Sequence, residues 1–250
     1  MHSSRDIWPD IAVQVAGCID RLGSGEFYPR FFQMMKTLAQ IDQYMVFEFS
    51  PNGDYATCRL AHNVEHPDLG LQLASLYLDG AYLDDPMLKE LKQSVLSQTD
   101  AAPYRLLAKR QLPPVYRRRF FNVPNFDTKF SLVVLDRTSQ HIFYVNFYSK
   151  KEDGFAEGQL DSLKQISSLI GSLLLKHFRD ERKQRGMIKS LLASGLSERE
   201  AQICNMILQG HTAKSIGNEL ELSESTVITY KKRAFKKLKI NRKSDLVRFV

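Results

Sequence analysis

The C-terminal segment, residues 196–250, constrains the fold more than any other part of the chain, because local patterns in it specify successive helices. Ser197 stands three residues before Glu200, the spacing of a capping box at the start of a helix. Gly210 follows about three turns later and suits the left-handed residue that ends a helix. The segment therefore predicts a small helical unit rather than part of a sheet.

A third predicted helix in this unit has one apolar and one polar face. Thr212 caps a short second helix that ends near Leu220, and Ser223 caps the third. The apolar face holds Val227, Tyr230, Ala234 and Leu238, which can pack on Ile203, Ile216 and Leu220. The opposite face presents Ser225, Ile228, Thr229, Lys232 and Lys236. Such a helix suits the major groove of DNA, where cations meet phosphates and side chains near the helix N-terminus reach base edges.

The order and spacing of these residues resemble the helix-turn-helix of LuxR/FixJ-type transcription regulators. The matching positions are Leu196, Ser197, Arg199, Glu200, Gly210, Lys214, Ile216, Leu220, Ser223, Thr226, Val227, Lys237, Leu238 and Arg242. The resemblance implies a four-helix DNA-binding domain. In such a domain, Ile228, Thr229 and Lys232 would contact bases, and Thr226, Arg233 and Arg242 would contact phosphates. Lys214, Ser225 and Lys236 are the remaining expected DNA contacts. Ile228 and Tyr230 depart from the family's frequent lysine and histidine, so a half-site preference does not transfer.

The positive charge of the chain is concentrated in and just before this segment. The 250 residues carry a formal net charge of +7, and residues 196–250 hold eleven Lys and Arg against six Asp and Glu. Residues 176–195 hold six against two, which leaves the rest of the chain slightly acidic. This distribution favours a polyanionic partner, most commonly nucleic acid, although an anionic membrane surface would attract the same charge.

Cysteine usage and hydropathy indicate a cytoplasmic protein. The three cysteines are odd in number and far apart, which argues against a disulfide framework, and Cys204 at an apolar helix position reads as a small core residue. No apolar run approaches the roughly 20 residues of a membrane span, and the N-terminus lacks a secretory apolar core. His62 and His66 lack a third ligand, so we expect neither a metal nor a cofactor.

The N-terminal region predicts an α+β fold, an antiparallel sheet with flanking helices. Apolar periodicity predicts helices over 7–22, 27–38, 69–78, 85–96 and 155–178, and aromatic and β-branched runs predict strand pairs over 44–61 and 130–148. Asn52 and Gly53 mark the turn of the first hairpin. Hairpins interrupted by helices are typical of PAS-like or GAF-like sensor domains. We expect a sensor domain over 1–178, a linker over 179–195 and the helix-turn-helix domain over 196–250.

The last helix of the sensor domain carries an apolar stripe. Its members are Leu163, Ile166, Ile170, Leu173 and His177. Their spacing fits packing on the sheet and fits the seam of a short coiled-coil dimer, and about two heptads do not decide between these interpretations.

The order of elements in the sensor domain resembles the autoinducer-binding domain of quorum-sensing LuxR proteins. Tyr77, Tyr82, Asp85 and Pro86 resemble its tyrosine-rich stretch that ends in Asp-Pro. The resemblance implies that Asp85 accepts a hydrogen bond from a ligand beside Tyr77 and Tyr82. The family's pocket tryptophans have no counterpart, because Trp8 is the only tryptophan, so we expect a small-molecule effector other than an acyl-homoserine lactone. Asp85 can alternatively cap a helix that starts at Pro86.

These patterns together predict a homodimeric, ligand-responsive transcription regulator of LuxR type that binds double-stranded DNA, with RNA polymerase as a candidate partner. Two alternatives stay open: an acyl-homoserine lactone receptor, and an enzyme-like sensor domain that turns over its ligand. We expect no enzyme activity, because the chain has no nucleophile elbow, phosphate-binding glycine loop or paired-Cys zinc pattern.

Overall fold

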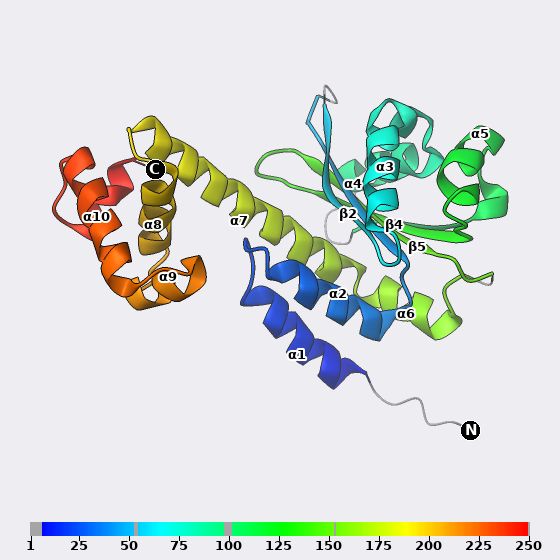
Figure 1. The fold of residues 1–250 in the computed structure, drawn as a ribbon. Helices are drawn as coiled ribbons and strands as arrows, with labels where there is room; N and C mark the ends of the chain where they lie inside the picture. The colour runs from blue at the N-terminus through cyan, green and yellow to red at the C-terminus, as the bar shows by residue number, and fades with distance from the viewer. Residues whose placement is uncertain (1–6, 53–54, 98–101, 153, 250) are drawn as a thin grey trace. The chain divides into compact units, whose positions relative to one another are not determined.

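The N-terminal part of the chain folds around a five-stranded antiparallel sheet (Figure 1). The computed structural model describes residues 7–52, 55–97, 102–152 and 154–249, and it divides into two compact units between Phe178 and Arg179. The strands are β1 (Gln43–Phe49), β2 (Ala56–Asn63), β3 (Tyr104–Ala108), β4 (Thr128–Leu135) and β5 (Ile142–Ser149), in the spatial order β2-β1-β5-β4-β3. The predicted fold class is confirmed, although the edge strand β3 was not predicted. Gly53, in the predicted hairpin turn, lies outside the described residues.

Helices cover both faces of this sheet (Figure 1). One face packs against α1 (Trp8–Ile19), α2 (Phe27–Leu38), α6 (Glu157–Gln165) and the first part of α7 (Ser167–Ala193). The other packs against α3 (Pro67–Leu78), the 3₁₀ turn η1 (Ala81–Asp84), α4 (Pro86–Ser97), α5 (Pro114–Arg117) and the π-helical turn η3 (Arg118–Asn122). A second 3₁₀ turn, η2 (Lys109–Gln111), follows β3. Each face therefore has its own hydrophobic cluster.

Successive residues of the central strands contribute to alternate clusters. On β5, Phe143 and Phe147 join the cluster of α1 and α2, whereas Tyr144 and Tyr148 join the cluster of α3 and α4. Burying one such large side chain stabilises the fold by about 1.5–3 kcal/mol. Because both faces are buried, these strands read as continuous apolar and aromatic runs, and the few polar residues within them are buried too.

The apolar stripe of the last helix is buried inside the N-terminal unit. Leu163, Ile170 and His177 are almost completely inaccessible, and the His177 ring stacks on Phe27 with centroids 4.0 Å apart. The structure therefore supports the packing interpretation over the coiled-coil seam. The predicted single helix over 155–178 is interrupted at Ile166, which separates α6 from α7.

Residues 179–193, for which we expected a linker, are helical and continue α7. The segment has few apolar anchors, but its arginines, lysines and glutamine are good helix formers. Glu181 and Arg185 also form an i,i+4 ion pair, with Oε2 and Nη2 3.5 Å apart. Helical propensity and the packing of Leu191 in the C-terminal core account for the helix in the segment where we expected a linker.

The C-terminal unit is entirely helical. It contains α8 (Glu198–Leu208), α9 (Ala213–Leu220), α10 (Glu224–Leu238) and the 3₁₀ segment η4 (Lys243–Phe249). Its core is a third hydrophobic cluster, which includes Ile203, Ile216, Val227, Ala234, Leu238 and Leu246 and also Leu191 from the end of α7. The predicted packing of α10 on α8 and α9 is confirmed, and the expected fourth helix is a 3₁₀ helix.

The three cysteines are distributed over the three clusters. Cys18 lies in the α1 and α2 cluster, Cys58 packs against the α3 and α4 cluster, and Cys204 lies in the C-terminal core. Burial raises the pKa of each thiol to about 11. All three therefore stay protonated near neutral pH, as expected for packing residues.

Residues 7–52, 55–97, 102–152 and 154–249 provide neither a membrane-spanning helix nor a metal-binding cluster. Within them, no helix combines the length and apolar composition that crossing a bilayer requires. The same residues hold no group of three His, Cys, Asp or Glu side chains placed to bind a metal ion. His62 instead stacks on Phe32, with centroids 4.3 Å apart, and His66 is exposed.

Candidate functional site

Three local caps position the helices of the candidate DNA interface. Ser197 Oγ accepts from Glu200 N at 3.4 Å while Ser197 N donates to Glu200 Oε2 at 2.8 Å, so the predicted capping box of α8 is formed. Thr212 Oγ1 accepts from Ser215 N at 3.1 Å at the start of α9. Ser223 Oγ accepts from Thr226 N, also at 3.1 Å, at the start of α10. The helix starts predicted from these residues are therefore confirmed.

The turn between α9 and α10 depends on Gly217. Leu222 N donates to Gly217 O at 2.8 Å, which folds the chain back on the end of α9. A Cβ atom on Gly217 would lie 2.6 Å from the Leu222 carbonyl oxygen, closer than real Cβ contacts allow. The angle at which α10 leaves α9 thus requires glycine here.

The exposed face of α10 carries the residues predicted for DNA contact. Ser225, Thr229, Lys232, Arg233 and Lys236 are exposed, as are Lys214 on α9 and Arg242 after α10, while Thr226 is half-buried beside the N-cap. Ile228 has 39% of its surface exposed even though it is apolar and branched. Ile228 is therefore accessible from the same face as the polar and basic residues of α10.

An ion pair between a buried carboxylate and an exposed lysine joins α8 to α10. Glu200 is buried, and its Oε2 lies 2.6 Å from Lys237 Nζ. Burial opposes ionisation of this carboxyl, but the hydrogen bonds from Lys237 and Ser197 outweigh it and lower the pKa of Glu200. Glu200 therefore both caps α8 and fixes the position of α10.

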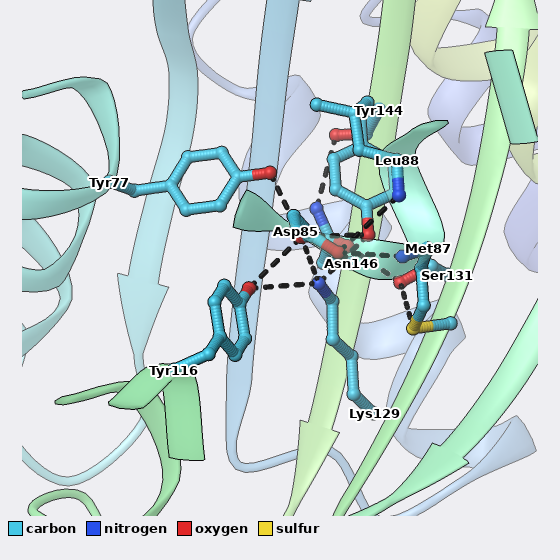
Figure 2. Close-up of polar contacts among 9 residues, drawn as sticks. All are labelled: Tyr77, Asp85, Met87, Leu88, Tyr116, Lys129, Ser131, Tyr144 and Asn146. Carbon is cyan, nitrogen blue, oxygen red and sulfur yellow. Dashed lines mark hydrogen bonds and ion pairs between the residues drawn. The ribbon is translucent and has the colours of Figure 1, made fainter. Parts of the chain in front are cut away.

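The second candidate site is a buried polar cluster around Asp85, which we call the Asp85 cage: Tyr77, Asp85, Tyr116, Lys129 and Tyr144 (Figure 2). The hydroxyls of Tyr77 and Tyr116 each donate to Asp85 Oδ2 at 2.9 Å, and that of Tyr144 at 3.1 Å. Lys129 Nζ donates to the same oxygen at 2.8 Å. All five side chains are at most 3% exposed.

Asp85 also caps α4 through its other oxygen. Oδ1 accepts from Met87 N at 3.0 Å and from Leu88 N at 3.3 Å. The helix-capping interpretation of Asp85 is therefore confirmed, and the cage adds a second role to the same carboxylate. Next to the cage, Ser131 Oγ donates to Asn146 Oδ1 at 2.6 Å.

Burial and charge set the protonation states in the cage. Burial opposes ionisation of Asp85, but attraction to Lys129 and the donated hydrogen bonds prevail and lower the pKa of this carboxyl. Burial and the negative charge of Asp85 raise the pKa of Tyr77, Tyr116 and Tyr144 well above the ordinary value. The hydroxyls therefore keep their protons and act as donors to an ionised Asp85.

Of the three predicted effector contacts, the structure brings Tyr77 and Asp85 together in the cage. Tyr82 is half-buried, and its ring packs against Phe49 and Tyr77, with centroids 5.5 and 6.3 Å away. Tyr116, Lys129 and Tyr144 were missed, although a lysine in the apolar run of β4 was a visible signal for a buried charge.

Comparison with known proteins finds one family model and one curated relative, and each matches part of this chain. Residues 194–250 match the family model described as bacterial regulatory proteins, luxR family. The response regulator protein TmoT of Ectopseudomonas mendocina is 36% identical over 84 residues, which are 32% of this chain and 38% of TmoT. The chain thus spans less than two-fifths of the curated relative that it matches.

Two solved structures resemble the fold at low sequence identity. The N-acylhomoserine lactone dependent LuxR family transcription factor CepR2 of Burkholderia cenocepacia is 10% identical, with a TM-score of 0.50, over 69% of this chain and 98% of that chain. Escherichia coli SdiA is 16% identical, with a TM-score of 0.49, over 98% of this chain and 96% of that chain. At such identity, the similarity to CepR2 concerns the fold alone.

Proposed function

We propose, from the membership of residues 194–250 in the luxR family of bacterial regulatory proteins, that this chain regulates transcription by placing α10 in the major groove of DNA. The observation that carries this proposal is the asymmetry of α10. Val227, Ala234 and Leu238 fix one side in the C-terminal core, while Lys232 and Lys236 stand exposed on the other. A helix held in this way can enter a groove without losing its own packing.

The proposed contact residues divide into two groups, as the resemblance to LuxR/FixJ-type helix-turn-helix domains implies. Ile228, Thr229 and Lys232 are our proposed base contacts, and all three are exposed on α10. The proposed phosphate contacts are Lys214, Ser225, Thr226, Arg233, Lys236 and Arg242. The branched methyl groups of Ile228 suit the C5 methyl of thymine, which a lysine at that position would not favour.

Further partners stay predictions. A homodimer would place two copies of α10 on half-sites about one turn of DNA apart, and this symmetry would give a palindromic operator. We also propose that this chain contacts RNA polymerase, is cytoplasmic, and acts as a regulator rather than as an enzyme. These proposals rest on the match of residues 194–250 to the luxR family model.

The effector contact predicted at Tyr77, Tyr82 and Asp85 also stays a prediction, and the cage limits its form. Both oxygens of Asp85 already accept hydrogen bonds from the protein. The lactone dependence of CepR2 makes a lactone receptor a second candidate function for this chain. In that case the amide of the ligand must displace Lys129 or a tyrosine hydroxyl from Asp85.

Selection of bound sequences from a randomised duplex pool by the full chain tests the proposed function. We expect a single palindromic consensus, with affinity falling about 10³-fold or more between 50 and 200 mM salt for six or more phosphate contacts. Lys236→Glu should weaken binding to the consensus strongly, whereas Lys89→Glu, an exposed lysine on α4, should not. Failure to enrich any sequence, together with binding that ignores salt, would contradict the proposal.

A further inference from the structure

The ammonium group of Lys129 is bound as completely as a small cationic ligand would be in a dedicated pocket. Nζ lies 2.8 Å from Asp85 Oδ2, 2.8 Å from Tyr144 Oη and 3.4 Å from Tyr116 Oη. An ammonium has three protons to donate, and here each faces an acceptor. Lys129 is 0% exposed, so bulk water does not reach its ammonium group.

Aromatic rings complete the surroundings of this ammonium. Nζ lies 4.8 Å from the ring centroid of Tyr144, 5.7 Å from that of Tyr116 and 5.8 Å from that of Tyr148. Rings at such distances attract a cation through their quadrupoles, and aromatic enclosures of this type recognise ammonium ligands. The chemistry of the cage is therefore that of a binding site for an alkylammonium ion.

The parts of the cage come from distant segments of the chain. Tyr77 lies on α3, Asp85 just before α4 and Tyr116 on α5, while Lys129 and Tyr144 lie on β4 and β5. The Lys129 to Asp85 bond spans 44 residues and the Tyr144 to Asp85 bond spans 59. The cage thus ties the helical layer of α3, α4 and α5 to the sheet.

Stability alone gives little reason for such a pair. Replacing a buried ion pair by apolar side chains of similar volume is often neutral or stabilising, because the desolvation of two charges offsets their attraction. The surrounding cluster is otherwise built from aliphatic and aromatic residues that could fill this volume. A carboxylate with four donors on one oxygen is better explained as a recognition site.

We propose that Lys129 is the internal ligand of the Asp85 cage, so that the N-terminal domain reaches its folded form without a small-molecule effector. The ammonium holds the carboxylate and two tyrosine hydroxyls in place, and the helical layer stays seated on the sheet. Resting on the proposed function, this inference means that the chain binds DNA with no effector present.

Replacing the internal ligand by a free one tests the site directly. Lys129→Ala removes three methylenes and the ammonium, which together correspond to n-propylammonium. The full-length variant should unfold at a lower temperature than the wild type, and millimolar n-propylammonium chloride at about ten times its dissociation constant should raise its midpoint by about 3 °C or more. Neutral 1-propanol should not do so, and neither compound should shift the wild type.

The outcomes of this experiment divide clearly. Rescue by n-propylammonium that disappears in Asp85→Asn/Lys129→Ala supports the proposal, because the second change removes the carboxylate partner. A Lys129→Ala variant as stable as the wild type, or a destabilised one that n-propylammonium does not rescue, overturns it.

A double-mutant cycle keeps the proposal testable if Lys129→Ala does not fold. Lys129→Met keeps most of the volume and leaves the buried carboxylate without a counter-charge, whereas Asp85→Asn/Lys129→Met removes both charges. We expect the double variant to unfold at a higher temperature than Lys129→Met. Additive losses from the two single changes would show that the residues are not coupled, and would overturn the proposal.

Native mass spectrometry of the full chain bound to its selected duplex tests the regulatory part. The expected mass is that of protein and DNA alone, and a small molecule retained at one per chain would overturn effector independence. If the chain selects no duplex, the proposed function fails, but the n-propylammonium experiment still decides the role of Lys129 because its readout is thermal unfolding.

Discussion

The two domains place their basic side chains in opposite ways. In the N-terminal domain Lys129 is fully buried and each ammonium proton faces an acceptor from the protein. In the C-terminal domain Lys232 and Lys236 stand on the exposed face of α10. A buried cation has its partner built in and fixes the position of the groups around it, whereas an exposed cation is available for an external polyanion. Variants in the two domains should therefore fail in different assays.

The largest expected effect is the loss of stability in Asp85→Ala. The change strips Lys129 of its counter-charge and removes the cap of α4, so we expect the N-terminal domain to lose about 3–5 kcal/mol. Trp8, the only tryptophan, lies in that domain, and its fluorescence during urea unfolding measures the loss. Asp84→Ala is the matched control because Asp84 is the exposed neighbour. Equal effects from both variants would rule out a specific role for the cage.

Gly217→Ala tests the comparison in the C-terminal domain. The added Cβ would lie 2.6 Å from a backbone oxygen in the turn before α10, so we expect the C-terminal domain to lose about 1–3 kcal/mol and DNA affinity to fall with it. The Trp8 transition should not move. Gly158→Ala, where a Cβ meets nothing within 4 Å, serves as control. A wild-type thermal profile for Gly217→Ala would contradict the tight turn.

Variants at a proposed base contact and at a proposed phosphate contact should separate the specificity of DNA binding from its affinity. Lys232→Ala is expected to reduce discrimination between the selected operator and single-base variants by about 1–3 kcal/mol. Arg242→Ala, which removes a phosphate contact, should weaken binding to all of them alike and lower the salt slope by about one unit. Competition titrations measure both quantities. Sequence-blind losses from Lys232→Ala would remove it from the base-contacting residues.

The smallest expected effect is a change in pH dependence at Glu200. Its folded pKa is lowered, so its contribution to stability is fully present above the ordinary value of 4.5 and is lost as pH falls through the folded pKa. Glu200→Gln should remove roughly 1 kcal/mol at neutral pH and flatten this acid dependence of the C-terminal domain. Thermal scans between about pH 3 and pH 6 measure it. Glu198→Gln, exposed in the same helical turn, should keep the wild-type slope.

The sequence predicts the C-terminal domain better than the N-terminal one because its determinants are local. Ser197, Thr212 and Ser223 act on backbone groups three residues away, and each helix starts where its cap predicts. Strand β3 was missed because it is short and lies at the sheet edge, where half-exposed residues give no clear alternation. The helical stretch after Phe178 was not predicted because residues 179–186, its first two turns, contain no apolar side chain.

The Asp85 cage shows what local patterns leave out. Asp85 was identified beside Pro86, and its capping role follows from that local sequence. Its partners on β4, β5 and α5 are 31 to 59 residues away. The register of the sheet brings Lys129 and Tyr144 to one face, and the packing of α5 on that face adds Tyr116. A lysine within an apolar strand signals a buried partner but does not name it.

The placement of one cysteine in each hydrophobic cluster has a practical consequence. A protonated, buried thiol reacts with a maleimide only after its surroundings open, so the rates of modification of Cys18 and Cys204 report local opening events. Cys18 follows the α1 and α2 side of the sheet and Cys204 the helix-turn-helix, whereas the half-buried Cys58 reports the accessibility of the α3 and α4 side. Peptide mapping after timed labelling would thus yield two opening rates and one accessibility from one unmodified protein.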